Sequence, residues 1–159
     1  KEGYFPYLST EYLRNNGKPK FAVPNDNVVL VEDADLILLW DGSNAGEFFM
    51  GKKGILSSTM VKIQLKKDIN TIFLFYLLKT KEKGLSSQTR GTGIPHVDKN
   101  VLEDIKIPLP PLPEQEKIAE ILSTVDRKLE LEKRRKEKLE RIKKGLMEEL
   151  LTGKKRVKV

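Results

Sequence analysis

Residues 107–122 read Ile107-Pro-Leu-Pro-Pro-Leu-Pro-Glu-Gln-Glu-Lys-Ile-Ala-Glu-Ile-Leu122, a proline-rich segment that runs directly into a helical pattern. Prolines disfavour helix in the residue before them and hold the backbone extended. Pro113 stands where proline suits the first turn of a helix, and Glu114 and Glu116 complement the positive end of the helix dipole. The segment therefore predicts the end of a globular part and the start of a long helix.

The predicted helix covers residues 114–151 and would be roughly 57 Å long at about 1.5 Å per residue. Its apolar residues recur at spacings of three and four near both ends, and the charged segment 132–138 separates the two groups. Such a helix alone in water exposes two apolar stripes, so the pattern predicts an antiparallel partner helix. The residues expected to pair the helices are Ile118, Leu122, Val125, Leu129, Leu139, Ile142, Leu146 and Leu150.

The composition suits one domain with an appendage: 159 residues, of which 38% are apolar and 33% charged. The chain has no cysteine, which excludes disulfides, thiolate metal sites and cysteine nucleophiles. The longest apolar run, residues 72–78, is far shorter than the roughly 18 residues that span a bilayer, and no signal-peptide pattern opens the chain. We therefore expect a cytoplasmic protein with no membrane partner.

The net charge of +7 suggests an anionic partner, and most of it lies in the C-terminal part. Residues 113–159 hold 15 Lys or Arg against 10 Asp or Glu, whereas residues 1–112 hold 15 against 13. A basic helix is often only a solvated face, so charge alone leaves nucleic-acid binding open. In the nearly neutral part, DNA recognition would depend on local basic clusters and base contacts.

Mixed strands and one helix before the prolines predict an α+β domain. The strand-like segments are 28–31 and 36–40, joined by a turn at 32–35, then 47–50 and 60–65, the last with Val61, Ile63 and Leu65 on one face. A buried helix runs from a cap at Asn70 to Thr80. Irregular or turn segments are 1–27, the basic hairpin tip 51–54 and the polar loop 84–100. The domains expected are a globular domain at 1–112, a long helix at 113–152 and a basic tail at 153–159.

Two further stretches, Leu36-Ile-Leu-Leu-Trp-Asp-Gly-Ser43 and Gly91-Thr-Gly-Ile-Pro-His-Val-Asp98, join the proline-to-helix run in a family resemblance. In order and spacing the three resemble the DNA-specificity (S) subunit of type I restriction–modification systems. The resemblance implies one target recognition domain with its spacer helix. In that family two recognition domains are held apart by two antiparallel helices, and each reads a few base pairs of a split target.

The resemblance also implies partners. Such a subunit binds double-stranded DNA and directs methyltransferase (M) subunits, which bind near the helices, and through them restriction (R) subunits. The chain holds one domain and one helix, so a homodimer or a second recognition domain from elsewhere would supply the other half. It begins at a Lys without the family's usual strand-forming opening, which suggests a fragment or a trimmed chain.

Catalytic patterns are scarce. His96 is the only histidine, which excludes a His-based metal cluster and suits a hydrogen-bonded loop residue. Asp41, Glu47 and Lys52 have the wrong spacing for a nuclease triad, and no glycine-rich run matches a nucleotide-binding loop. Trp40 ends an apolar strand, which favours packing over base stacking. We expect no catalysis, no metal and no cofactor.

The candidate DNA contacts are polar or basic side chains in predicted loops, where phosphate and base contacts are usually made. For each of them a solvated loop is the alternative. They are Lys18, Lys20, Ser43, Asn44, Lys52, Lys53, Ser87, Gln88, Arg90 and Thr92. The alternative function is a non-catalytic coiled-coil interaction protein that assembles a complex without reading DNA.

Overall fold

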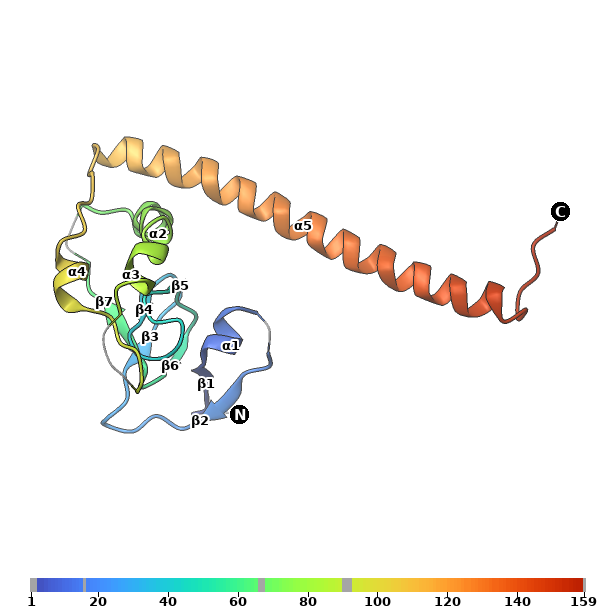
Figure 1. Ribbon diagram of the computed structural model, residues 1–159, viewed down its shortest axis with the longest axis horizontal. Helices are drawn as coiled ribbons and strands as arrows, with labels where there is room; N and C mark the ends of the chain where they lie inside the picture. The colour runs from blue at the N-terminus through green and yellow to red at the C-terminus, as the bar shows by residue number, and fades with distance from the viewer. Residues whose placement is uncertain (1–2, 16, 66–67, 90–92, 159) are drawn as a thin grey trace. The chain divides into compact units, whose positions relative to one another are not determined.

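The computed structural model describes residues 3–15, 17–65, 68–89 and 93–158 (Figure 1). The chain forms two compact units, Lys1–Ala119, here called the head, and Glu120–Val159. The strands are β1 (Phe5–Leu8), β2 (Lys20–Ala22), β3 (Leu30–Val31), β4 (Leu36–Leu39), β5 (Phe48–Met50), β6 (Gly54–Leu56) and β7 (Met60–Ile63). The helices are α1 (Thr10–Leu13), α2 (Thr71–Lys79), α3 (Glu82–Ser86), α4 (Lys99–Glu103) and α5 (Leu112–Leu151). This mixture confirms the predicted α+β class.

The head contains two small sheets with strand orders β2-β1-β6-β3 and β5-β4-β7. One apolar cluster joins side chains of both sheets, and a second joins the other face of β4 and β5 to α2 and α3. All four residues of β4 are buried, because alternate side chains enter the two clusters. This explains the uninterrupted apolar run at Leu36–Leu39, which is typical of a strand covered on both faces.

The prediction that residues 1–27 are irregular is wrong, since this segment contains β1, α1 and β2. Ser9 caps α1 by accepting a hydrogen bond from the backbone N–H of Tyr12 at 3.2 Å. Strand β1 pairs antiparallel with β2 and parallel with β6, some fifty residues later. Pairing at such a distance stabilises a short strand that has no strong local pattern.

The two strands predicted around residues 32–35 are present as β3 and β4, but they lie in different sheets. The predicted hairpin at 51–54 is likewise wrong, because β5 and β6 belong to different sheets and residues 51–53 connect them. Gly54 is needed for close packing. A Cβ there would lie 2.8 Å from the Leu8 Cδ2 atom and would also meet the carbonyl oxygen of Pro6.

The strand predicted at 47–50 is confirmed as β5, and that at 60–65 as the shorter β7. The expected apolar face of β7 is correct only in part. Ile63 and Leu65 pack against the second cluster, but Val61 is exposed and Met60 on the opposite face enters the first cluster. Because β7 pairs only with β4, it lies at the edge of its sheet and keeps one side open.

The helix predicted from Asn70 is confirmed as α2, and the Asn70 side chain accepts a hydrogen bond from the backbone N–H of Phe73 at 3.0 Å. Only one face of α2 is buried, since Ile72 is exposed. The prediction of a loop at 84–100 is wrong in its regular parts, because α3 and α4 overlap this range. Helix α3 has a glycine at its centre and so lacks a helical signal, but its Leu85 enters the second cluster.

Helix α5 is a single helix of 40 residues, which confirms the predicted long helix with a start two residues earlier. Gly153, with φ +73°, follows its last turn. Within the head, the first two turns of α5 bury Gln115 and Ala119. No helix in the described part of the chain is long and apolar enough to cross a membrane.

Candidate nucleic-acid interface

The turn after β4 and the end of α3 lie together in the head. Gly46 has φ +98°, and a Cβ there would lie 2.9 Å from the Leu85 Cβ, so the turn approaches α3 as closely as only glycine permits. A surface pocket of about 540 Å³ opens between the two segments. It is lined by Arg14, Ser43, Asn44, Glu47, Glu82, Lys83 and Ser86. The fold therefore joins two of the predicted contact segments, at 43–44 and next to 87–88.

Three charged residues that line this pocket, Arg14, Glu47 and Glu82, are held in ion pairs. The Arg14 Nε donates to the two carboxylate oxygens of Glu47 at 3.2 and 3.1 Å, and these hydrogen bonds raise the pKa of Arg14 above its ordinary value. The Glu82 Oε1 accepts hydrogen bonds from the Lys79 Nζ and from the Phe48 backbone N–H, both at 2.7 Å. These charges hold α1, β5, α2 and α3 together, so we assign them to support and not to DNA contact.

The side chains of Ser87 and Gln88 fold back onto α3. The Ser87 Oγ donates to the carbonyl oxygen of Gly84 at 3.0 Å, and the Gln88 Nε2 donates to the same oxygen at 3.3 Å. Both side chains are exposed, so water or a ligand reaches them. Arg90 and Thr92 lie outside the described residues.

The second predicted basic segment lies where α1 leads into β2. Lys18 and Lys20 are exposed, and the Lys52 Nζ donates to the Asn15 Oδ1 at 2.6 Å while it lies 4.7 Å from the centre of the Tyr12 ring. The fold thereby brings Lys52 to Asn15, three residues before Lys18 in the sequence. We call Lys18, Lys20 and Lys52 the basic cluster.

Lys53 points elsewhere. Its Nζ lies 3.6 Å from the Glu32 Oε2, and its backbone N–H donates to the Asp33 Oδ1 at 2.8 Å. It is therefore tied to the turn between β3 and β4, where acidic side chains offset its charge. Lys53 is the weakest of the predicted contacts for this reason.

Sequence reasoning missed Phe21, which is 62% exposed on the edge strand β2. Val23, two residues later, is also exposed. The alternation of Phe21 and Val23 with Ala22 and Pro24 is the local signal for this strand, but the glycines, prolines and asparagines around it favour an irregular segment. An exposed aromatic residue next to lysines extends the candidate surface.

Residues considered for catalysis or stacking have other contacts. Glu47 is bonded to Arg14 and Lys52 to Asn15, so they do not form a triad with Asp41. His96 pairs with Asp41 through the backbone, and Trp40 packs against the second apolar cluster. Among the described residues no group of three or more His, Cys, Asp and Glu is arranged to hold a metal ion.

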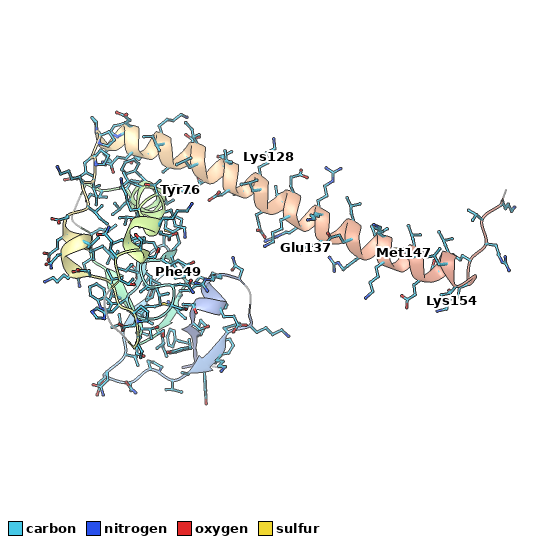
Figure 2. The ribbon with its side chains drawn as sticks, in the orientation of Figure 1. Phe49, Tyr76, Lys128, Glu137, Met147 and Lys154 are labelled. Carbon is cyan, nitrogen blue, oxygen red and sulfur yellow. The ribbon has the colours of Figure 1, made fainter. Side chains whose placement is uncertain are left out.

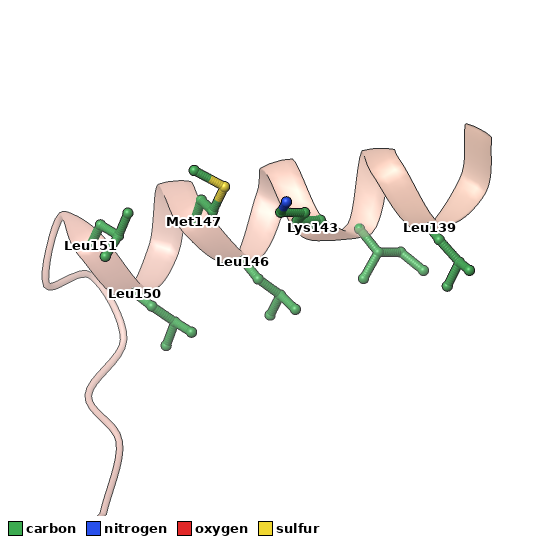
Figure 3. Close-up of a pocket in the computed structure, with 7 residues that line it drawn as sticks. Leu139, Lys143, Leu146, Met147, Leu150 and Leu151 are labelled. Carbon is green, nitrogen blue, oxygen red and sulfur yellow. The ribbon is translucent and has the colours of Figure 1, made fainter. Parts of the chain in front are cut away.

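The residues predicted to pair helices lie along α5. Seven of the eight, Leu122 to Leu150, are exposed, and Ile118 is half-buried. Figure 2 shows the side chains of α5 projecting along its whole length. Figure 3 shows Leu139, Leu146 and Leu150 projecting in one row, while Met147 and Leu151 project on the other side of the ribbon. This surface forms a shallow groove of about 330 Å³.

A family model for the type I restriction modification DNA specificity domain matches residues 1–141. The chain is 57% identical to the type I restriction enzyme MjaVIII specificity subunit of Methanocaldococcus jannaschii over 152 residues. This alignment covers 95% of this chain and 36% of that protein. It is 32% identical over 150 residues to the EcoDI specificity subunit of Escherichia coli, covering 91% of this chain and 33% of that protein. The chain thus spans about one third of the length of these relatives.

Solved structures agree in fold. The HsdS subunit from Thermoanaerobacter tengcongensis matches 94% of this chain and 37% of its own with a TM-score of 0.59 at 16% identity. A chain from a structure on the assembly and conformational transition of the type I R-M system matches 91% of this chain and 37% of its own, with a TM-score of 0.65 at 18% identity. From the matched domain and the identity of these relatives it follows that the chain belongs to the family of type I restriction modification DNA specificity domains.

Proposed function

We propose that this chain reads one half of a bipartite DNA target and is held beside a second recognition domain by paired antiparallel helices. The observation that carries the proposal is α5, a 40-residue helix whose apolar side chains are exposed in two stripes. The two apolar clusters of the head contain no residue of α5, so they do not account for the exposed stripes. A second helix packed against both stripes would remove these apolar side chains from water, which explains why the helix carries them.

The pairing has a definite register. Matching one stripe with the other sets Ile118 opposite the partner's Leu150, and Leu122 opposite the partner's Leu146. In each case the two residue numbers add to 268, so the crossing point is at Arg134. The same register sets Glu132 opposite the partner's Lys136, twice by symmetry. Two opposite charges therefore meet where the apolar stripes are interrupted, which favours this register over shifted ones.

DNA contact is assigned to two surfaces of the head. The first is the basic cluster together with Phe21. Lys18 and Lys20 are both exposed, and their charge suits contact with a phosphate backbone. The second is the pocket, where Ser43 and Asn44 offer donors and acceptors of the kind that read base edges, with the exposed Gln88 just beyond the lining residue Ser86 in the sequence. Lys83 adds a cation to the pocket lining.

The chain would carry no catalysis of its own. Methyltransferase subunits would bind near the paired helices in the cytoplasm, and restriction subunits would join through them. The second recognition domain would come from another copy of this chain or from further sequence of the same protein. A homodimer would read a palindromic split site.

Selection from a random duplex pool tests the proposal. We expect the chain to enrich two half-sites at a fixed spacing. The basic cluster variant Lys18→Gln, Lys20→Gln, Lys52→Gln should bind all duplexes more weakly, whereas the matched variant Lys99→Gln, Lys154→Gln, Lys158→Gln, which removes as many charges elsewhere, should still enrich the motif. Enrichment of no motif under any salt condition would favour the non-catalytic interaction protein instead.

A further inference from the structure

The C-terminal end of α5 exposes more apolar surface than its pairing stripe. Met147 is 50% exposed and Leu151 is 78% exposed, and both line the shallow groove together with Leu146 and Leu150. Figure 3 shows that Met147 and Leu151 project on the other side of the ribbon from these two stripe residues. A partner helix that covers the stripe therefore leaves them on its flank. Neighbouring apolar side chains in water mark a contact surface.

The same flank of α5 is covered where the helix begins. A residue one position after a stripe residue is rotated from it by about 100° around the helix, always in the same sense. Met147 follows Leu146 in this way, and Ala119 follows Ile118. Ala119 belongs to the head and is 4% exposed. The head thus covers at the start of α5 the flank that is exposed at its end.

Antiparallel pairing brings these two parts of the flank together. The two-fold axis of such a pair is perpendicular to the plane of the two helices, so the same flank of each helix faces the same side of the pair. In the register proposed above, the partner's Met147 stands level with residue 121, and the partner's Leu151 stands level with residue 117. Ala119 lies midway between these levels. The exposed flank of one chain therefore meets the level at which the other chain's head covers α5.

The length of α5 fits this arrangement. The helix ends at Leu151, and Gly153 with φ +73° follows. In the same register the partner's Gly153 stands level with Gln115. The Gln115 side chain is 2% exposed, because it is bonded to the N–H of Asn70 and to the carbonyl oxygen of Pro110. The partner's helix therefore ends at the level where the head surrounds the first turns of α5.

The head has an exposed apolar residue at this place. Gln115 contacts Asn70, which caps α2, and Ile72 lies two residues further along the chain. Ile72 is 38% exposed and lies outside the face of α2 that packs into the second apolar cluster. An aliphatic side chain beside the start of α5 matches two apolar side chains that arrive at the same level.

We propose that the end of each α5 docks on the head of the partner chain, with Met147 and Leu151 packed against Ile72. The proposal rests on the proposed function, which supplies the antiparallel pair and its register. The contact occurs twice by symmetry and ties each head to the helix of the other chain. The two heads then keep one orientation on the helix pair, as the reading of two half-sites at a fixed spacing requires.

Cysteine cross-linking tests the contact, because the chain has no cysteine of its own. A chain with Ile72→Cys is mixed with a chain with Met147→Cys, and a short bismaleimide is added. The mixture should give a cross-linked dimer. Met147→Cys alone should not, because its two copies stand about 39 Å apart along the pair at about 1.5 Å per residue. A mixture of Ile72→Cys with Leu131→Cys is the matched control and should give none.

Self-association measures the energy of the same contact. Met147→Ala with Leu151→Ala should raise the dissociation constant of the dimer about tenfold or more, since four apolar side chains lose their burial. Leu131→Ala with Val157→Ala removes as many exposed apolar side chains elsewhere and should change it little. Ile72→Ala and Met147→Ala should together cost less than the sum of their separate effects, because they remove one shared contact.

The outcomes separate this contact from the helix pairing. A dimer in sedimentation equilibrium that gives no cross-link between positions 72 and 147, or in which the effects of Ile72→Ala and Met147→Ala simply add, overturns the docking and leaves the pairing intact. The flank would then belong to a different protein. A chain that stays monomeric at every concentration overturns the homodimer itself, and the docking with it.

Discussion

The head and the second unit of this chain treat their apolar and charged residues in opposite ways. The head buries Leu8, Ile37, Leu38 and Phe48 completely, and some of its ion pairs join residues far apart in the sequence, as Arg14 joins Glu47. In Glu120–Val159 the apolar side chains are exposed, and the ion pairs that are seen lie within six residues of each other. The head thus buries apolar residues within itself, whereas Glu120–Val159 exposes the apolar surface that we propose a partner helix covers.

The largest effect should come from charge placed in the paired stripes. The variant Leu122→Asp, Leu146→Asp puts four carboxylates into a dimer and removes about 1.5–3 kcal/mol of burial at each site, so association should vanish in sedimentation equilibrium. The head should stay folded. Leu131→Asp, at a position outside the stripes, is the control and should leave association nearly unchanged. A dimer that survives the double variant would show that these stripes do not pair.

The second largest effect should come from a substitution that creates a cavity in the core of the head. Phe48→Ala should lower the free energy of unfolding by about 3–5 kcal/mol, because the Phe48 side chain on β5 is fully buried in the cluster that β5 shares with α2 and α3. Leu131→Ala, where the side chain is 64% exposed, should cost less than about 0.5 kcal/mol. Urea unfolding followed by the fluorescence of Trp40 measures the change in the head, and the helical circular dichroism signal followed in the same titration measures the change in α5. Equal costs at the two sites would contradict the contrast between the units.

A smaller effect should arise where α5 begins in the head. Gln115 is 2% exposed; its Oε1 accepts from the Asn70 N–H at 3.0 Å and its Nε2 donates to the Pro110 carbonyl oxygen at 2.8 Å. Gln115→Ala leaves both backbone groups unpaired, so unfolding of the head should become easier by about 1–3 kcal/mol. Glu116→Ala, one residue later and exposed, is the control. Equal urea midpoints for the two variants would show that this contact does not support the head.

The smallest effect should come from the charge pair at the helix crossing. Glu132→Lys alone, or Lys136→Glu alone, sets like charges opposite each other twice in a homodimer. Each should weaken self-association, by about 0.2–1 kcal/mol per pair. A mixture of the two variants should restore association, because unlike charges then meet. Fluorescence energy transfer between labelled chains measures this, and preference of each variant for itself would exclude the antiparallel register.

The sequence located the candidate DNA contacts but not their grouping. Lys52 lies far from Asn15 in the sequence, and the pairing of β1 with β6 brings Lys52 to Asn15, three residues before Lys18. The same holds for Ser43 and Ser86, which line one pocket because Gly46 allows the turn to approach α3. Lys53 shows the reverse, since a neighbour in sequence turns toward different partners.

The sequence by itself determined α5, its capping prolines and its two stripes, because helical hydrogen bonds and side-chain periodicity act within a few residues. It also determined α2, through the Asn70 cap, and the buried strand β4, through its apolar run. Only the tertiary structure decided the division into two sheets, the strands before residue 27 and the helix at Leu85. These short elements are stabilised by contacts with distant parts of the chain, and no local pattern records which partner a strand will find.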